Sequence, residues 1–114
     1  MIRAVWISGC NLVVKDNDET VAEGEIAQSD GTWFLERAEA VPALDSVYGD
    51  LLVRVMIRRA YELGAHVQYV YATNETEKFY RRLGFEHEAN IPAMKPGDVV
   101  RIKMKHVGDV TGHC

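Results

Sequence analysis

Cysteine, proline and long apolar runs are all scarce in this sequence of 114 residues. Its two cysteines, Cys10 and Cys114, lie near opposite ends without the spacing of metal ligands or of a disulfide framework, so the pattern favours a reducing cytoplasm. No apolar stretch approaches the roughly 20 residues of a membrane span, and the start of the chain lacks the features of a signal peptide. We therefore expect a cytoplasmic protein that does not associate with a membrane.

Basic residues are also in the minority, since 13 lysines and arginines stand against 17 aspartates and glutamates, for a net charge of −4. Binding to a phosphate backbone depends on clustered Lys and Arg, so nucleic acid is excluded as the main ligand. The four histidines share no metal-ligand spacing, and no metal site is expected. With 47% apolar residues, residues 1–114 suffice for one globular domain and are too few for two.

Hydrophobic periodicity divides the first half of the chain into strands and a helix. Three short β-prone runs separated by turn clusters predict an antiparallel meander. These runs are residues 11–14, 20–26 and 32–41. Apolar residues at three- and four-residue spacing then predict a helix from Gly49 to a C-cap at Gly64, and residues 66–71 indicate a buried strand after that helix.

The second half adds a shorter helix and a last strand. The helix is predicted to start at Asn74, whose side chain and that of Glu77 suit a capping box, and to end at Gly84. Residues 99–107 alternate apolar with basic side chains, which is typical of a strand with one wet face. The order of elements predicts a mixed α/β (α+β) fold in one domain.

The second helix carries a motif that resembles a known family. Residues 79–85, Phe-Tyr-Arg-Arg-Leu-Gly-Phe, are similar to the late motif of the GNAT N-acetyltransferase superfamily. The spacing of Val41-Pro42, Gly49, Leu52, Ala60 and Gly64 resembles that family's strand, pyrophosphate loop and helix. The resemblance implies a GNAT-like acyl-CoA N-acyltransferase fold over residues 1–114, with a mixed, mostly antiparallel sheet and two main helices. Because few residues precede the meander, the chain resembles a short, N-terminally truncated member.

By the same resemblance, acetyl-CoA is the co-substrate. Its pyrophosphate would lie on the helix N-terminus, where unpaired main-chain N–H groups favour an anion, and its pantetheine arm along a strand edge at residues 40–43. The implied contacts are Ala40, Val41, Ala43, Asp45, Ser46, Val47, Tyr48, Gly49, Asp50, Asn74, Phe79 and Tyr80. The loop is degenerate, since Leu44 and Val47 stand where the family pattern has Gln or Arg and glycine, and a β-branched residue disfavours positive φ.

Three side chains are candidates for the chemistry. The resemblance implies that Tyr80 protonates the departing CoA thiolate, which a phenol with a pKa near 10 can do; the alternative is a core aromatic that only packs. Glu36 and Glu39 are candidate bases, with solvated strand residues as the alternative. Three residues apart on a regular strand, they point to opposite faces, so at most one fits. Cys10 fits a small buried hydrophobe better than a nucleophile.

Two functions follow from this pattern. The leading hypothesis is direct transfer of an acetyl group from acetyl-CoA to a primary amine of an unidentified acceptor. The alternative is a non-catalytic GNAT-like module that senses acyl-CoA or binds a protein, as Leu44 and Val47 indicate. With few residues ahead of the meander, the acceptor is either large, or walled in by a second subunit, or absent. We expect a homodimer, because a small core with an uncovered sheet face favours self-association.

Overall fold

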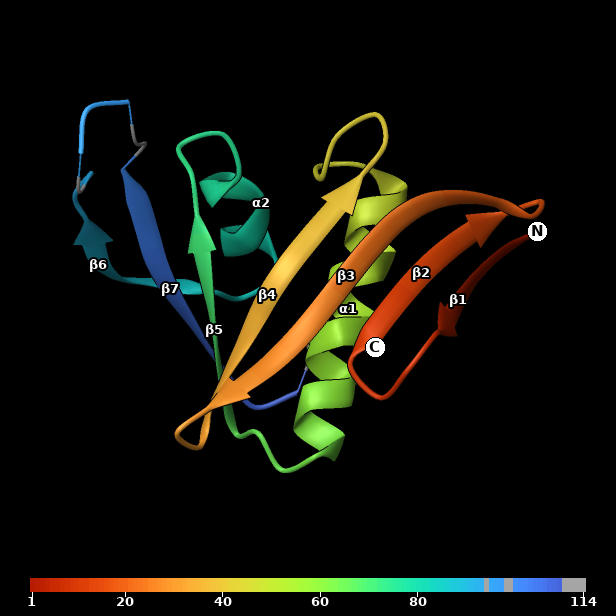
Figure 1. The fold of residues 1–114 in the computed structure, drawn as a ribbon, viewed down its shortest axis with the longest axis horizontal. Helices are drawn as coiled ribbons and strands as arrows, with labels where there is room; N and C mark the ends of the chain where they lie inside the picture. The colour runs from red at the N-terminus through yellow and green to blue at the C-terminus, as the bar shows by residue number, and fades with distance from the viewer. Residues whose placement is uncertain (94, 98–99, 110–114) are drawn as a thin grey trace.

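The computed structural model describes residues 1–93, 95–97 and 100–109. Over these residues the chain forms one seven-stranded sheet and two helices (Figure 1). In chain order the elements are β1 (Ile2–Trp6), β2 (Asn11–Asp16), β3 (Glu19–Ser29), β4 (Thr32–Ala40), α1 (Val47–Glu62), β5 (Val67–Ala72), α2 (Glu77–Arg82), β6 (Glu86–Ile91) and β7 (Arg101–Val107).

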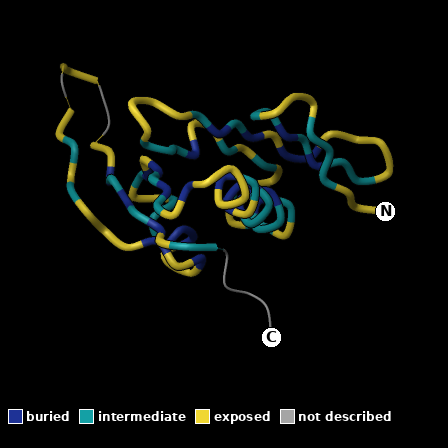
Figure 2. Tube along the Cα trace, turned by 90° about the horizontal axis from the view of Figure 1, so that it is seen from below, coloured by how far each residue is buried: buried dark blue, intermediate teal, exposed yellow. Residues whose placement is uncertain are grey.

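The strand order is β1-β2-β3-β4-β5-β7-β6, and within the described strands only β4 and β5 pair in parallel. The parallel pair is the one that α1 connects, as expected for a crossover helix. Both helices lie on the same face of the sheet (Figures 1 and 2). The predicted α+β fold with a mostly antiparallel sheet is therefore confirmed.

The core lies between the sheet and the two helices. Helix α1 buries Leu52, Val53, Met56, Ile57 and Ala60, which recur at the spacing of one helical face. The side chains of Met56 and Leu52 leave no room for a Cβ at Gly24 of β3, so α1 approaches the sheet closely there. Within the part of the chain that the structure describes, no helix covers the opposite face of the sheet (Figure 2).

The open face corrects the prediction of a strand buried on both sides. Strand β5 buries Gln68, Val70 and Ala72 against the helices, whereas Tyr71 is 40% exposed on the other face. On that face Phe34 lies against Tyr69 and Tyr71, each with ring centroids 5.7 Å away. The alternation of a strand with one wet face thus applies to β5 as well as to β7.

Most predicted elements are present, and several of their ends differ by one to three residues. The capping box at Asn74 is wrong: α2 begins at Glu77 after Thr76, and the Thr76 hydroxyl accepts a hydrogen bond from the Thr73 N–H at 2.9 Å. Gly84 does follow the helix with φ of 101°. The last strand starts at Arg101, with Val100 outside it, and residue 99 of the predicted range lies outside the described residues.

Two strands were not predicted at all. Strand β1 pairs with β2 from Ile2 opposite Asp16 to Trp6 opposite Leu12, and β6 pairs with β7. The sequence of β6, Glu-His-Glu-Ala-Asn-Ile, has little β-propensity, so tertiary pairing decides its conformation.

Candidate functional site

A gap opens between β4 and β5 on the side of their carboxyl ends. The two strands pair only at Trp33 with Gln68 and at Phe34 with Tyr69. Beyond these pairs β4 runs on to Ala40 and β5 to Ala72 without contact in the ladder. Figure 1 shows the strands diverging there, with α2 behind the gap and the start of α1 beside the end of β4. The carboxyl ends of strands next to a crossover are a common place for a ligand.

The β4 edge offers free main-chain groups to this gap. Val41 N–H donates to Val21 C=O at 3.0 Å, and in an antiparallel ladder every second residue bonds to the same neighbour. The main-chain groups of Ala38 and Ala40 therefore point away from β3 and into the gap. Of the predicted edge at residues 40–43, Ala40 offers its groups, Val41 N–H is already used, and the Ala43 C=O accepts from the Ser46 hydroxyl at 2.6 Å.

The loop before α1 ends in a side-chain cap. Ser46 is the N-cap, and its hydroxyl oxygen accepts from the Gly49 N–H at 3.2 Å. Within the described residues, the main-chain N–H groups of Val47 and Tyr48 have no acceptor. Val47 is not among the described residues with positive φ, and its side chain is 72% exposed. The expected conflict between a β-branched residue and positive φ therefore does not arise, and two N–H groups remain available to an anion.

Gly49 is fixed by a close approach of the backbone. A Cβ built at this position would lie 1.8 Å from the Leu44 C=O oxygen. The loop thus folds back onto the first turn of α1, where only glycine fits. The match of Gly49 to the family pattern has a local structural cause.

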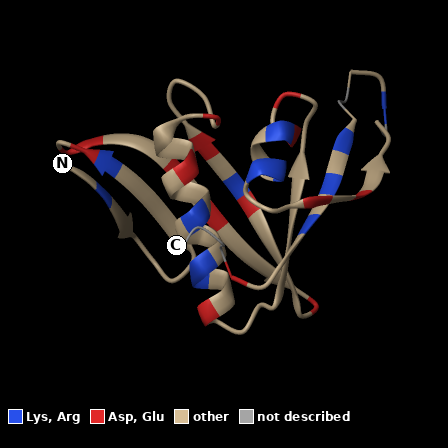
Figure 3. Ribbon diagram, turned by 180° about the vertical axis from the view of Figure 1, so that it is seen from behind, with Lys and Arg blue, Asp and Glu red and all other residues tan. Residues whose placement is uncertain are grey.

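Charged groups surround the same helix end. Asp45 forms an ion pair with Arg82 of α2 at 2.5 Å, and Asp50 pairs with Arg54 at 2.8 Å. Figure 3 shows the acidic residues near both ends of α1 and the basic ones between them. Tyr48 donates a hydrogen bond to the Asp16 carboxylate, and this bond raises the pKa of Tyr48. Asp45 and Asp50 would repel an anion at this site, whereas Arg82 would attract it.

Tyr80 packs into the core from α2. Its ring makes edge contacts with Phe79 and Phe85, at centroid distances of 5.2 Å and 5.4 Å, and the residue is 4% exposed. Among the described residues the Tyr80 hydroxyl has no hydrogen-bond partner, and it is not one of the fully buried unpaired side-chain oxygens. Burial raises the pKa of Tyr80, which keeps the phenol protonated near neutral pH.

The two candidate bases lie on an irregular part of β4. Glu25 pairs with Arg37 and Ile26 with Leu35, so Glu36 is an extra residue in a β-bulge. Because the bulge shifts the alternation, the argument that Glu36 and Glu39 must point to opposite faces is wrong. Both are exposed, and Glu39 contacts Arg37 at 3.7 Å. Glu39 also lines a hollow of about 180 Å³ with Ala40 and with residues 20–23 of β3, on the side of β4 that pairs with β3.

The predicted site residues lie on the elements that surround the gap. Ala40 is the last residue of β4, residues 43–50 lead into α1, the two glutamates lie on β4, and Tyr80 lies on α2, which stands behind the gap (Figure 1). Asn74 lies in the turn before α2, and Phe79 is a buried core residue. Sequence reasoning missed Ala38 and Arg82. The bulge that orients Ala38 has no signal in the sequence, and Arg82 lies within the motif of residues 79–85 without a local sign of its partner Asp45.

The described residues contain no group of three or more His, Cys, Asp or Glu side chains that could hold a metal ion. None of the helices in these residues is long and apolar enough to cross a membrane.

Comparison with known proteins gives matches in structure alone. No family model matches the chain, and no curated protein matches its sequence. Among solved structures, 144 chains match. One is nourseothricin acetyltransferase, with 20% identity and a TM-score of 0.74 over 85% of this chain and 64% of that one.

Two further structures extend the comparison. The Salmonella typhimurium protein yncA, solved with its cofactor acetyl-CoA, has 21% identity and a TM-score of 0.70 over 90% of this chain and 66% of its own. A GCN5-related N-acetyltransferase from Rhodopseudomonas palustris has 15% identity and a TM-score of 0.64 over 85% of this chain and 60% of its own. The chain spans about two thirds of the length of these proteins. The identities are low, and the shared arrangement of strands and helices is extensive: the chain has the GNAT acetyltransferase fold.

Proposed function

We propose that the chain is an acetyl-CoA-dependent N-acetyltransferase that moves an acetyl group directly to a primary amine of an acceptor. The observation that carries the proposal is the gap between β4 and β5, where Ala38 and Ala40 present unpaired main-chain groups. The N-terminus of α1 follows the loop after β4, and Tyr80 belongs to α2, the helix behind the same gap (Figure 1). The fold and the yncA structure with acetyl-CoA support the assignment of the co-substrate.

The residues fit the parts of acetyl-CoA by their chemistry. The free N–H groups of Val47 and Tyr48, with the dipole of α1, suit a pyrophosphate. The groups of Ala38 and Ala40 suit the amides of an extended arm, because an exposed strand edge accepts and donates as a ladder does. Acetyl-CoA, when bound, supplies the activated acetyl group.

The proton transfers belong to the side chains. A carboxylate, Glu36 or Glu39, takes a proton from the acceptor amine, whose nitrogen then forms a bond to the acetyl carbonyl carbon. The carbon–sulfur bond breaks, and the Tyr80 hydroxyl gives its proton to the departing thiolate. A phenol held protonated by burial suits that donation. A cytoplasmic location and a homodimer are part of the same proposal.

A non-catalytic role is the second candidate. The Ser46 hydroxyl already occupies the Gly49 N–H, and the Asp45 carboxylate lies in the loop where an anion would bind. Both features weaken a pyrophosphate site. In that case the chain senses acyl-CoA or binds a protein partner.

Calorimetric titration with acetyl-CoA and with CoA, followed by a thiol-release assay over a set of amines, tests the proposal. We expect binding with a dissociation constant below about 1 mM, roughly 4 kcal/mol of binding, and release of thiol with at least one amine. The absence of binding would reject the transferase, and binding without thiol release from any amine would favour the second candidate.

The variant Tyr80→Phe separates chemistry from folding. Because the hydroxyl has no hydrogen-bond partner among the described residues, its loss should change stability by less than about 0.5 kcal/mol. Turnover should fall by about 100-fold or more while acetyl-CoA affinity stays the same. Tyr61→Phe, at the far end of α1, is the matched control and should keep full turnover. Equal activity in Tyr80→Phe would remove this residue from the mechanism.

A further inference from the structure

The two edges of the sheet differ in how they are protected. Strand β6 at one edge carries Glu86 and a bulge at Glu88, and charge and bulges both discourage pairing with another strand. Strand β1 at the other edge, Ile-Arg-Ala-Val-Trp, carries one charge, Arg3, and pairs with β2 in a regular register without a bulge. Its outer side therefore remains competent to accept a strand.

The direction of the free main-chain groups on β1 follows from its ladder. Ile7 N–H donates to Asn11 C=O at 2.8 Å, and Asn17 N–H donates to Met1 C=O at 3.1 Å, so odd-numbered residues bond to β2. Ile2, Ala4 and Trp6 consequently turn their N–H and C=O groups away from β2. An exposed row of such groups is a template for another strand.

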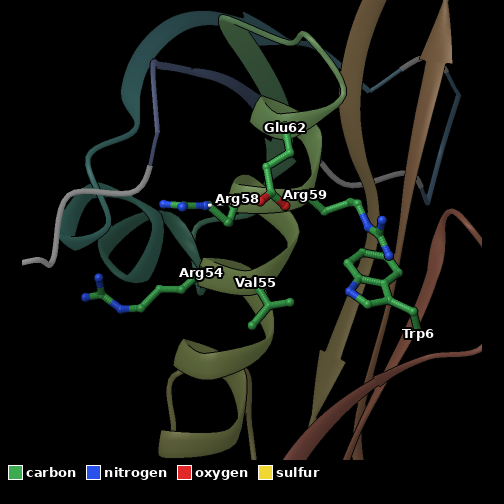
Figure 4. Close-up of a pocket in the computed structure, with 6 residues that line it drawn as sticks. All are labelled: Trp6, Arg54, Val55, Arg58, Arg59 and Glu62. Atoms are coloured by element: carbon green, nitrogen blue, oxygen red, sulfur yellow. Dashed lines mark ion pairs between the residues drawn. The ribbon is translucent and has the colours of Figure 1, made fainter.

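A hollow lies beside this edge on the helix side of the sheet. It has a volume of about 470 Å³ and is lined by Trp6 of β1 and by residues of α1: Arg54, Val55, Arg58, Arg59 and Glu62 (Figure 4). The Arg59 guanidinium lies 4.3 Å from the centroid of the Trp6 ring and, among the described residues, has no carboxylate partner. Helix α1 thus extends beside the edge strand β1 and leaves a partly apolar space that a further strand would cover.

We propose that β1 pairs antiparallel with β1 of a second copy of this chain, about a two-fold axis at Ala4. In this register Ala4 lies opposite Ala4, and Ile2 lies opposite Trp6 of the other copy. These are the residues whose main-chain groups are free, so the pairing forms about six hydrogen bonds. The result is a continuous sheet across the dimer, which is an isologous contact.

The side chains of the same register are complementary. Ala4 and Trp6 pack towards the core, so even-numbered residues of β1 lie on the helix face. Ile2 is 42% exposed, and in the dimer it lies beside Trp6 of the other copy, over the hollow. Pairs of an aromatic and a β-branched residue across strands are stabilising.

Charge favours a second copy over an unrelated strand. The turn at residues 16–19 follows the β2 end that pairs with Ile2, and Asp18 in it is 89% exposed. Antiparallel pairing brings this acidic turn of one copy to the Trp6 end of the other, where Arg59 lies over the Trp6 ring. The gap between β4 and β5 is several strands away and stays open, so the inference does not depend on acyl transfer.

Sedimentation equilibrium on the whole chain tests the proposal. The expected mass at tens of micromolar is about twice the chain mass of 12.8 kDa. In Ala4→Pro the lost N–H is one that β2 does not use, and proline is tolerated in an edge strand, so the fold should persist by circular dichroism. Dimerisation should weaken by about 30-fold or more, because two hydrogen bonds are lost and the ring obstructs the pairing.

Two further variants keep the test decisive. If Ala4→Pro does not fold, Ile2→Lys serves in its place, because it removes the contact with Trp6 of the other copy and should also yield monomer. The control Val107→Lys changes an apolar residue that is 67% exposed on another strand, and it should stay dimeric. In a background of Cys10→Ser and Cys114→Ser, Ala4→Cys should form a disulfide-linked dimer on oxidation, because the two copies of residue 4 are a hydrogen-bonded pair about 5.5 Å apart. Val5→Cys should not form this dimer, because in the same register residue 5 lies opposite residue 3 of the other copy. A monomeric wild type, or a dimer unaffected by Ala4→Pro and Ile2→Lys, would overturn the proposal.

Discussion

Replacement of Gly49 by alanine distinguishes local propensity from tertiary contact. Gly49 lies in the first turn of α1, and alanine is favoured over glycine in a helix by about 1 kcal/mol. Propensity alone therefore predicts a stabilised protein. The structure predicts the opposite sign, because the new Cβ would lie 1.8 Å from the Leu44 C=O oxygen and 2.7 Å from the Leu44 carbonyl carbon.

The magnitude follows from what must move. Both atoms belong to the backbone, and contacts of a Cβ under 3.0 Å are essentially never observed, so the loop must retreat by more than an ångström. That movement breaks the hydrogen bond from Gly49 N–H to Ser46, and the loss of an N-cap costs about 1 kcal/mol. It also separates Ser46 N–H from Leu44 C=O, a bond of 2.9 Å that contributes about 1 kcal/mol more. With strain included, we expect a net loss of about 2 kcal/mol.

Urea and thermal unfolding measure this effect. A loss of about 2 kcal/mol lowers the Tm of a domain of this size by about 8 °C. The control is Gly9→Ala, because a Cβ at Gly9 meets no atom within 4 Å, and its Tm should hardly change. A Gly49→Ala protein as stable as the parent, or more stable, would show that the loop does not need the close approach at Leu44.

Two further predictions concern charge. Asp45→Asn removes an anion from the loop and releases Arg82, so the affinity for acetyl-CoA should rise by about two- to fivefold at low salt. The control Glu62→Gln, at the other end of α1, should leave the affinity unchanged. A weaker affinity of Asp45→Asn in calorimetry would contradict the assigned binding place. Burial lowers the pKa of His106, so the unfolded chain binds a proton that the folded chain does not. The contribution of neutral His106 to the free energy of unfolding should be fully present above a pH of about 6.5 and should be lost as the pH drops through the folded pKa. In urea melts, His106→Gln should flatten this pH dependence, whereas the exposed His87→Gln should preserve it. Equal pH dependence in the parent protein and in His106→Gln would refute this role.

The sequence predicts those elements whose hydrophobic period is strong. Helix α1 and the meander follow from regular spacing, and the GNAT-like motif at residues 79–85 corresponds to α2 with its flanking core residues. Strands β1 and β6 were missed because pairing with distant strands, and not local propensity, determines them. The start of α2 was misplaced because residues 74–76 form a turn before the helix, and the Thr76 hydroxyl, which makes no cap hydrogen bond to α2, accepts from the Thr73 N–H instead.

The sequence predicts a set of candidate site residues, most of them close together along the chain, and it does not predict how these residues are arranged in space. A positive φ was expected at position 47, where it would strain a β-branched valine. Helix α1 begins at Val47 instead, and this residue is not among the described residues with positive φ. The pair of Asp45 and Arg82 joins residues far apart in the sequence, so no local pattern indicates it. The bulge at Glu36 reverses the alternation of β4 and thereby decides which main-chain groups face the gap.

The short pairing of β4 with β5 also has a mechanical meaning. The two parts of the sheet, β1–β4 and β5–β7, are joined in the ladder at Trp33 and Phe34 only, so a rotation of one part relative to the other would pivot at this joint. Ala40 lies about 16 Å from the joint along β4, so a rotation of about 5° moves it by more than an ångström. The ion pair between Asp45 and Arg82 joins the loop that follows β4 to α2, the helix that follows β5. It is thus a side-chain contact between elements that belong to the two parts of the sheet.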